Sequence, residues 1–260
     1  MGRKTLYSEQ RKQQIISVVK ELRSVSVNEL SQRFSVTSAT IRSDLTELEK
    51  SGQLIRTHGG AIVKTEIAHE QFLSERKNHE IKHKLAFAAI ATINDGESLL
   101  LDTGTTTLAF AKVLADSHIK NLNVFTNDFE IAHILEANQN IDVTLIGGTV
   151  RSGFHYTYGT QAIRQLERFM FDKVILGTSA LSLDHGLSTQ HIETAEIKKC
   201  MCQVARMTVL LTDSSKLHQS SFAQFASLKN IDHLIIDSAI TDFDRTRLME
   251  LVTTLTMVDA

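Results

Sequence analysis

Apolar residues near the start of the chain recur every three or four positions, which is the period of an amphipathic helix. Ile15, Val19 and Leu22 predict a first helix with one buried side. Ser8 is placed to begin it, because a serine side chain can satisfy free backbone N–H groups at a helix start. The pattern therefore opens on a helix that needs a partner to cover its apolar side.

Two further helices follow, joined by a short connection. Ser26 and Glu29 have the spacing of a capping box, which predicts that a helix of about two turns begins there. Residues 35–37 can do little more than turn, and Thr37 can cap the next helix. Gly52 is placed to end that helix. The apolar positions expected to face inward are Val27, Leu30, Phe34, Ile41, Leu45 and Leu48.

Two short strand-like segments come next, at residues 53–56 and 61–63. The residues between them, Thr57 to Gly60, include two glycines and predict the tip of a hairpin. Three helices followed by a hairpin are typical of a winged helix-turn-helix, which places the start of its last helix in the major groove of DNA. We therefore predict a DNA-binding domain over residues 1–63.

The exposed side of the predicted third helix carries small and polar groups around Arg42, which suits contact with phosphates and base edges. The alternative is a protein-binding module whose polar side is merely solvated. Asp44 lies beside the buried stripe and is expected to be a structural partner of a basic residue. The residues predicted to contact DNA are Ser38, Ala39, Thr40, Arg42, Ser43, Thr46, Arg56 and His58.

The rest of the chain alternates between short apolar runs and helical segments. Residues 64–80 are polar and predict a linker, and a helix is expected from about Ile81 to Ile93. Such alternation predicts an α/β domain over residues 81–260, with a mainly parallel sheet covered by helices on both faces. The expected strands are 99–101, 123–126, 142–146, 173–177, 208–212 and 233–237. The expected helices are 107–115, 129–137, 160–169 and 193–207.

Ligands of such sheets bind beyond the carboxyl ends of the strands. The segment from Asp102 to Thr107 combines a glycine and several hydroxyls at a helix start, a setting that suits a phosphate group. Each such loop could instead be an ordinary turn or cap, because Gly, Thr, Asn and Asp form these anyway. The residues predicted to bind a small anionic ligand are Asp102, Gly104, Thr105, Thr106, Thr107, Asn127, Gly147, Gly148, Arg151 and Lys216.

Charge and composition support this division. The first 64 residues carry eleven Lys and Arg against six Asp and Glu, whereas the remainder is acidic and the whole chain of 260 residues has a net charge of −2. A basic N-terminal part fits a polyanionic partner. No apolar run approaches 18 residues, so we expect a cytoplasmic protein with no membrane partner. Cys200 and Cys202 have no metal-site spacing, and we expect no metal and no cofactor.

The segment from Thr37 to Leu45, with Gly52, Arg56 and the Gly59–Gly60 pair, resembles the DNA-binding signature of the DeoR family of bacterial sugar-metabolism repressors. The sequence departs from the family pattern at Ser43, where a second basic residue is common. The resemblance continues through further motifs over nearly the whole chain. These are Arg76, Gly96, Asp102–Thr106, Thr126–Asn127, Gly147–Gly148, Arg151, Phe171–Lys173, Gly186–Thr189 and Asp213–Lys216.

This resemblance implies a C-terminal sheet similar to that of ribose-5-phosphate isomerase and a phosphorylated sugar or sugar alcohol as effector. The segment from Asp102 to Thr106 would then be the phosphate and sugar loop, with Asn127, Arg151 and Lys216 as further contacts. We expect a transcriptional repressor of a carbohydrate-utilisation operon, with double-stranded operator DNA as partner. A homo-oligomer, a dimer or a tetramer, would reach two half-sites.

A sugar-phosphate isomerase is the alternative, since such enzymes share the expected sheet. Such isomerases resemble one another in a loop of clustered acids after a central strand, whereas the residues from Gly177 onward are small and neutral. Asp184 and His185 remain as possible bases, but a turn is the favoured role for both. We therefore expect no catalytic residue in this chain.

Overall fold

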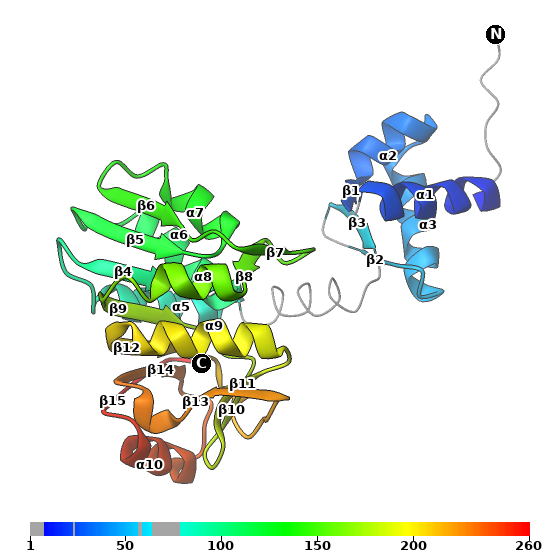
Figure 1. The fold of residues 1–260 in the computed structure, drawn as a ribbon. Coiled ribbons are helices and arrows are strands. Elements are labelled where there is room, and N and C mark those ends of the chain that lie inside the picture. Colours follow the sequence, from blue (N-terminus) through cyan, green and yellow to red (C-terminus); the bar gives the residue numbers. More distant parts are fainter. Residues whose placement is uncertain (1–7, 23, 57–58, 64–78) are drawn as a thin grey trace. The chain divides into compact units, whose positions relative to one another are not determined.

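The chain forms two compact units, Met1–Ser74 and Glu75–Ala260. The structure, a computed structural model, describes residues 8–22, 24–56, 59–63 and 79–260 (Figure 1). Among these residues, no helix has the length and apolar character that crossing a bilayer requires.

The first unit contains the three predicted helices and a small antiparallel sheet. Its helices are α1 (Ser8–Leu22), α2 (Val27–Phe34) and α3 (Ser38–Lys50). Its strands are β1 (Ser24–Ser26), β2 (Leu54–Arg56) and β3 (Gly60–Val63), in the order β1-β3-β2. The hairpin of β2 and β3 was predicted, whereas β1 was not. Three residues between two helices give too short a pattern to indicate a strand, and β1 exists because β3 pairs with it.

The predicted caps of α2 and α3 are confirmed. The Ser26 hydroxyl accepts from the Glu29 N–H at 3.1 Å, and the Glu29 carboxylate accepts from the Ser26 N–H at 2.7 Å. The Thr37 hydroxyl accepts from the Thr40 N–H at 3.2 Å. Gly52, with a φ of 72°, follows the last residues of α3 in the left-handed conformation that glycine tolerates best. Local sequence therefore fixes where both helices begin and where α3 ends.

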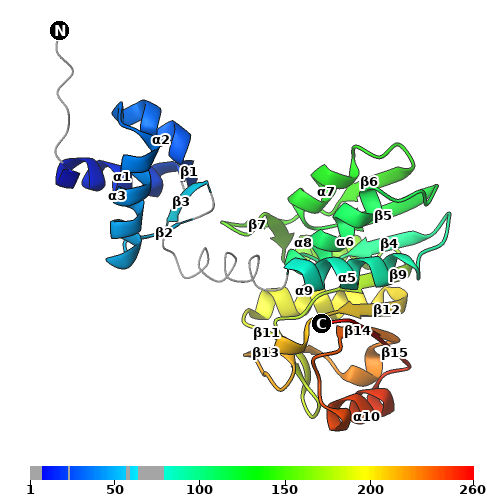
Figure 2. The same ribbon diagram turned by 180° about the vertical axis from the view of Figure 1, so that it is seen from behind.

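The second unit is built on a seven-stranded parallel sheet in the order β15-β14-β12-β9-β4-β5-β6 (Figures 1 and 2). Each of the six neighbouring pairs is parallel. The strands are β4 (Ser98–Leu101), β5 (Leu122–Thr126), β6 (Ile141–Leu145), β9 (Phe171–Leu176), β12 (Ala205–Leu211), β14 (His233–Asp237) and β15 (Thr254–Val258). The predicted parallel α/β class is thus confirmed.

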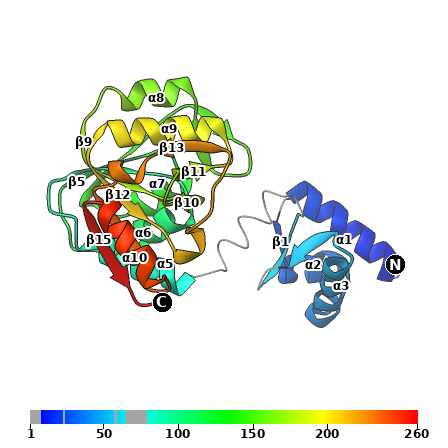
Figure 3. The ribbon, with the colours of Figure 1, turned by 90° about the horizontal axis from the view of Figure 1, so that it is seen from below.

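Helices cover both faces of this sheet (Figure 3). One face packs against α5 (His79–Ile90), α6 (Thr105–Ala115) and α7 (Phe129–Leu135). The other packs against α8 (Thr160–Leu166), α9 (Ile192–Gln203) and α10 (Asp242–Leu251). Neighbouring residues of β4 separate accordingly, since Leu100 belongs to one core and Leu99 and Leu101 to the other.

Several smaller elements complete the unit. A hairpin is formed by β7 (Thr149–Arg151) and β8 (Tyr156–Tyr158). A small antiparallel sheet is formed by β10 (Ala180–Ser182), β11 (Gly186–Thr189) and β13 (Ala223–Ala226). Two 3-10 turns are η1 (Ser214–Lys216) and η2 (Leu228–Asn230). None of these was predicted, because three- and four-residue strands depend on pairing with distant segments.

The prediction of a helix over 193–207 was wrong at its end. Helix α9 stops at Gln203, and Ala205 already pairs with Phe171 in the parallel sheet. The Val204 carbonyl accepts from the Phe171 N–H at 2.8 Å, so tertiary pairing overrides the local pattern there. The last helix and strand, α10 and β15, were also missed, because Phe243 and Met249 are exposed and blur the apolar stripe of α10.

Candidate functional site

Helix α3 separates buried apolar residues from exposed small and polar ones, as predicted. Ile41, Leu45 and Leu48 are buried in the core of the first unit. Ala39, Arg42 and Ser43 are exposed, and Ser38, Thr40 and Thr46 are half-buried. The outer side of the helix therefore has one long cation among short side chains, which lets a helix approach the base edges of a groove closely.

The hairpin strand β2 is tied to the same helix. The Arg56 guanidinium donates to the Thr46 hydroxyl at 2.8 Å, and that hydroxyl donates to the Arg42 carbonyl at 2.7 Å. The Arg56 N–H also donates to the Glu49 carboxylate at 2.9 Å. These hydrogen bonds fix the side chains of Arg56 and Thr46 in the protein without DNA. His58, the other predicted wing contact, lies outside the described residues.

A buried ion pair holds α3 against α1. Arg11 donates through Nε and one terminal nitrogen to the two oxygens of Asp44, at 2.5 and 3.0 Å. The hydrogen bond that Arg11 donates to Asp44 raises the pKa of Arg11 above its ordinary value. Asp44 is 3% exposed. It is therefore a structural partner of a basic residue, as expected, and cannot contact a base edge. The bidentate geometry fixes the orientation of the exposed side of α3.

In the second unit, the strand order reverses between β4 and β9. From β4 the chain passes through α6 to β5 on one side, whereas β9 begins the strands on the other side. A crevice at such a reversal is the usual ligand position in open α/β sheets. Asp102, at the end of β4, and Gly177, at the end of β9, meet there. The Gly177 N–H donates to Asp102 Oδ2 at 3.0 Å.

Lys198, a residue that the sequence did not single out, binds both Asp102 and Gly177 at this reversal. It lies on α9. Its ammonium donates to Asp102 Oδ2 and, at 3.0 Å, to the Gly177 carbonyl. The ammonium also lies 5.4 Å from the centre of the Phe225 ring. Asp102 Oδ1 is buried and has no hydrogen-bond partner among the described residues. One oxygen of this carboxylate is therefore satisfied by the protein, whereas the other could still accept a hydrogen bond.

The loop after Asp102 leads into α6 without a side-chain cap. Gly104 is the N-cap residue, with a φ of 133° that favours glycine. Thr105 and Thr106 are half-buried, whereas Thr107 is fully buried and donates to the Gly104 carbonyl at 2.9 Å. Thr107 thus shapes the loop. Gly104 has no side chain to cap the start of α6, and the N–H groups and positive dipole end of a helix start are the groups that attract an anion.

A second lysine reaches this loop from α5. Lys82 is 5% exposed, and its ammonium donates to the Thr105 hydroxyl at 2.9 Å. Nothing in the local sequence distinguishes Lys82 from the neighbouring Lys84. The packing of α5 against α6 is what directs Lys82 to the loop. A cation thus lies beside the start of α6, which is the arrangement a phosphate dianion requires.

Arg151 approaches the same edge from the β7–β8 hairpin. Its guanidinium lies over the Phe154 ring at 4.5 Å and donates to the Thr194 hydroxyl at 3.3 Å. The Tyr156 hydroxyl also bonds Thr194, at 3.0 Å. Thr194 and Lys198 are one turn apart on α9, so they share a side of that helix. The hairpin and α9 together bring Arg151 towards the Asp102–Lys198 pair.

Asn127 and Asp128 follow β5. Asn127 is fully buried, and its amide donates to the Thr157 carbonyl at 2.6 Å, whereas its side-chain oxygen has no partner among the described residues. Asp128 accepts from the Thr103 hydroxyl at 2.7 Å and caps α7. Burial raises the pKa of Asp128 above its ordinary value. Asn127 thus joins the hairpin to the sheet edge.

Other predicted residues have local roles in the structure. The Gly147 N–H donates to the Gln165 side chain at 3.2 Å, and a Cβ on Gly148 would lie 2.7 Å from the Tyr158 carbonyl oxygen. Lys216 is half-buried on η1, and among the described residues no hydrogen bond or ion pair joins it to the other predicted ligand contacts. These three residues are placed at the sheet edge but outside the bonded network around Asp102.

Asp184 and His185, the possible bases of an isomerase, lie in the turn between β10 and β11. Both residues are exposed, and the N–H groups of both donate to the Ser182 hydroxyl, at 3.3 and 3.1 Å. They make a tight turn, which is the role favoured from the sequence. Cys200 and Cys202 are free thiols on α9.

Known protein families match both units of the chain. The model of the DeoR-like helix-turn-helix domain matches residues 11–66, and that of the DeoR C terminal sensor domain matches residues 77–238. The chain is 38% identical to the HTH-type transcriptional regulator GlpR of Haloferax volcanii over 234 residues, covering 89% of this chain and 90% of that protein. It is 33% identical to the HTH-type transcriptional repressor GlcR of Bacillus subtilis, covering 89% of each.

Among solved structures, ribose 5-phosphate isomerase A of Methanocaldococcus jannaschii superposes with a TM-score of 0.41 at 19% identity, covering 54% of this chain and 55% of that one. A likeness this weak says nothing about activity. The family models and the relatives cover both units and describe regulators, which does not favour the isomerase alternative. By these matches the chain belongs to the DeoR family of transcriptional regulators.

Proposed function

We propose that this protein is a cytoplasmic repressor of a carbohydrate-utilisation operon, released from its operator by a phosphorylated sugar or sugar alcohol. Residues 1–63 bind DNA, residues 64–80 are the linker, and residues 81–260 sense the effector. The names of the relatives support regulation of transcription. The residues at the edge of the parallel sheet support the class of effector.

The class of effector is supported by one observation: a helix start with a cation beside it lies near a polar carboxylate. Lys82 and the uncapped α6 terminus at Gly104 suit a phosphate group. Asp102, with a buried oxygen that no described residue bonds, suits a sugar hydroxyl. A phosphate at one end and hydroxyls at the other are the features of a sugar phosphate. Asn127 and Arg151 are further contacts in this proposal.

On the DNA side, Arg42 is the residue expected to contribute most. It is exposed on α3 among Ser38, Ala39 and Ser43. A single winged helix-turn-helix covers little DNA, so two or more copies are needed to reach successive half-sites. The effector then acts by favouring an arrangement of subunits that no longer matches the operator. A coupling of about 1–3 kcal/mol per ligand is the usual size for such control.

The experiment has two stages. A thermal-shift screen of phosphorylated sugars and alditols identifies a ligand, because a ligand that binds the native state raises its melting temperature. Operator binding is then measured at fixed salt with and without that ligand. We expect several-fold weaker operator binding with the ligand and no change with the unphosphorylated sugar. Operator affinity that is the same in all three conditions would refute the proposal.

A further inference from the structure

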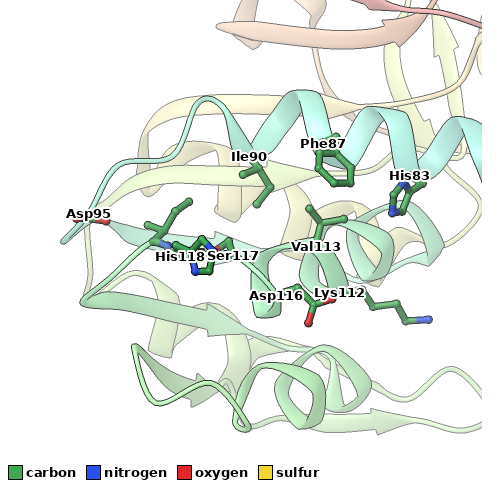
Figure 4. A pocket seen from close by; sticks show the side chains of 10 residues that line it. His83, Phe87, Ile90, Asp95, Lys112, Val113, Asp116, Ser117 and His118 are labelled. Carbon is green, nitrogen blue, oxygen red and sulfur yellow. Dashed lines mark hydrogen bonds between the residues drawn. The ribbon is translucent and has the colours of Figure 1, made fainter.

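A pocket of about 630 Å³ lies between α5 and the C-terminal half of α6, on side chains that the proposed DNA and effector contacts do not use (Figure 4). Phe87 and Ile90 of α5 point towards Val113 of α6. Ile119 adds to the apolar lining. Phe87 is 59% exposed, which is costly for a large apolar side chain beside a hollow. The surface formed by these residues, which we call the α5–α6 face, therefore has the character of a contact surface.

Two opposite charges that α6 contributes to this face are arranged so that they can complement those of a second copy. Lys112 and Asp116 line the pocket, both are exposed, and they lie one turn apart on α6. Among the described residues neither forms an ion pair. If a second α6 lies antiparallel across a two-fold axis between these positions, each Lys112 faces the Asp116 of the other copy. A partner of different sequence would need to supply the same two charges in reverse order.

The apolar residues fit the same symmetry. On α5, His83 and Ile90 lie on either side of Phe87, and the His83 and Phe87 rings are 4.9 Å apart (Figure 4). A two-fold axis near Phe87 places the two Phe87 rings together and sets His83 of each copy against Ile90 of the other. In a symmetric dimer, residue i of one copy contacts residue j of the other, and residue j of the first contacts residue i of the second.

We infer that the α5–α6 face is where a second copy of this chain docks, with Phe87 at the centre and Lys112–Asp116 pairs at the side. The inference deepens the proposed function, since it names the surface that joins the subunits. The same helices carry the candidate phosphate contacts, because Lys82 lies on α5 and α6 begins at Gly104. An effector bound there would act on the two helices that form the interface.

The test measures the mass of the full chain by sedimentation at several concentrations, in the absence of DNA and of any sugar phosphate. We expect the wild type to form at least a dimer and Phe87→Asp to weaken that association tenfold or more. Phe243→Asp, which also charges an exposed phenylalanine (68% exposed) on α10, is the matched control and should associate as the wild type does. The melting temperature of each variant confirms that it folds.

Charge reversal gives a second, independent readout. Lys112→Asp and Asp116→Lys should each weaken association, because each sets like charges opposite one another, whereas the double reversal should restore it. Since both residues are exposed, these variants should keep their fold. A monomeric wild type, an unchanged mass for Phe87→Asp, or an equal effect of Phe243→Asp would overturn the inference. Because no operator or effector is present, a wild type that associates but whose mass Phe87→Asp leaves unchanged would refute this interface without refuting the proposed function.

Discussion

Lys198 and Asp102, 96 residues apart in the sequence, form a buried ion pair where the strand order of the parallel sheet reverses. Lys198 thereby connects α9 to the ends of both β4 and β9, since it also bonds the Gly177 carbonyl. The pair neutralises charge within the sheet edge and leaves one carboxylate oxygen of Asp102 without a partner among the described residues. It is thus both a fixed part of the fold and a candidate surface for a sugar hydroxyl.

Replacing Lys198 by Met should destabilise the protein. The Asp102 carboxylate would stay buried without its cation, and breaking a buried pair from one side costs roughly 3–5 kcal/mol. Urea unfolding of the full chain measures this loss. The double variant Asp102→Asn/Lys198→Met should recover much of it, because no buried charge is left unpaired. A Lys198→Met protein as stable as the wild type would show that the pair contributes nothing to the fold.

Lys82→Gln should weaken binding of the sugar phosphate identified by the thermal-shift screen. A hydrogen bond to a charged group contributes about 1.5–3 kcal/mol, which corresponds to a tenfold loss of affinity or more. Calorimetric titration measures the affinity, and Lys120→Gln, at an exposed lysine outside the site, is the control.

The variant Thr105→Val/Thr106→Val should also abolish induction while operator binding persists. Unchanged affinity in Lys82→Gln, together with normal induction in the threonine variant, would show that the phosphate binds elsewhere.

Arg42→Ala should reduce specific operator binding by about 1–3 kcal/mol if the guanidinium reads a base, and should weaken binding to all sequences alike if it contacts phosphate. Titrations of operator and unrelated duplexes at several salt concentrations separate the two cases. Lys50→Ala, at the other end of α3, is the matched control because it removes one positive charge from the same helix. If the arginine and lysine variants lose equal affinity, Arg42 has no special role.

The two adjacent glycines after β6 should respond differently to alanine. A Cβ on Gly148 would lie 2.7 Å from the Tyr158 carbonyl oxygen and 3.2 Å from the Ala162 methyl, so backbone must move. We expect Gly148→Ala to cost about 1–3 kcal/mol, the usual size for overpacking. At Gly147 the nearest atom, 3.4 Å away, belongs to the Gln165 side chain, and alanine should be tolerated. Equal melting temperatures for the two variants would contradict this account.

Asp172 should make stability depend on pH in the acid range. Hydrogen bonds from the Ser98 N–H and hydroxyl, at 2.9 and 2.7 Å, lower the pKa of Asp172 in the folded state. A carboxyl whose folded pKa lies below its unfolded value stabilises the fold above the unfolded pKa, and this contribution is lost as the pH falls through the folded pKa. Melting temperatures of Asp172→Asn should therefore change less than those of the wild type between about pH 5 and pH 2. Parallel curves for the two proteins would refute this.

The sequence by itself determined the elements whose signals are local. Ser26, Glu29 and Thr37 specify the starts of α2 and α3, because a cap needs only residues within one turn. The apolar spacing of Ile41, Leu45 and Leu48 decided which side of α3 is buried. Alternation of apolar runs with helical segments gave the parallel α/β class, since buried strands need apolar residues on both faces.

Only the tertiary structure decided which distant residues share a site. Lys82 and Lys198 look like ordinary helix lysines in the sequence, yet packing buries both and directs each to the sheet edge. The strands β1 and β10 exist through pairing with partners elsewhere in the chain. A lysine on a helix surface and a lysine in a buried ion pair can have the same local sequence. The whole fold sets their surroundings, and the surroundings decide whether the charge is solvated or buried.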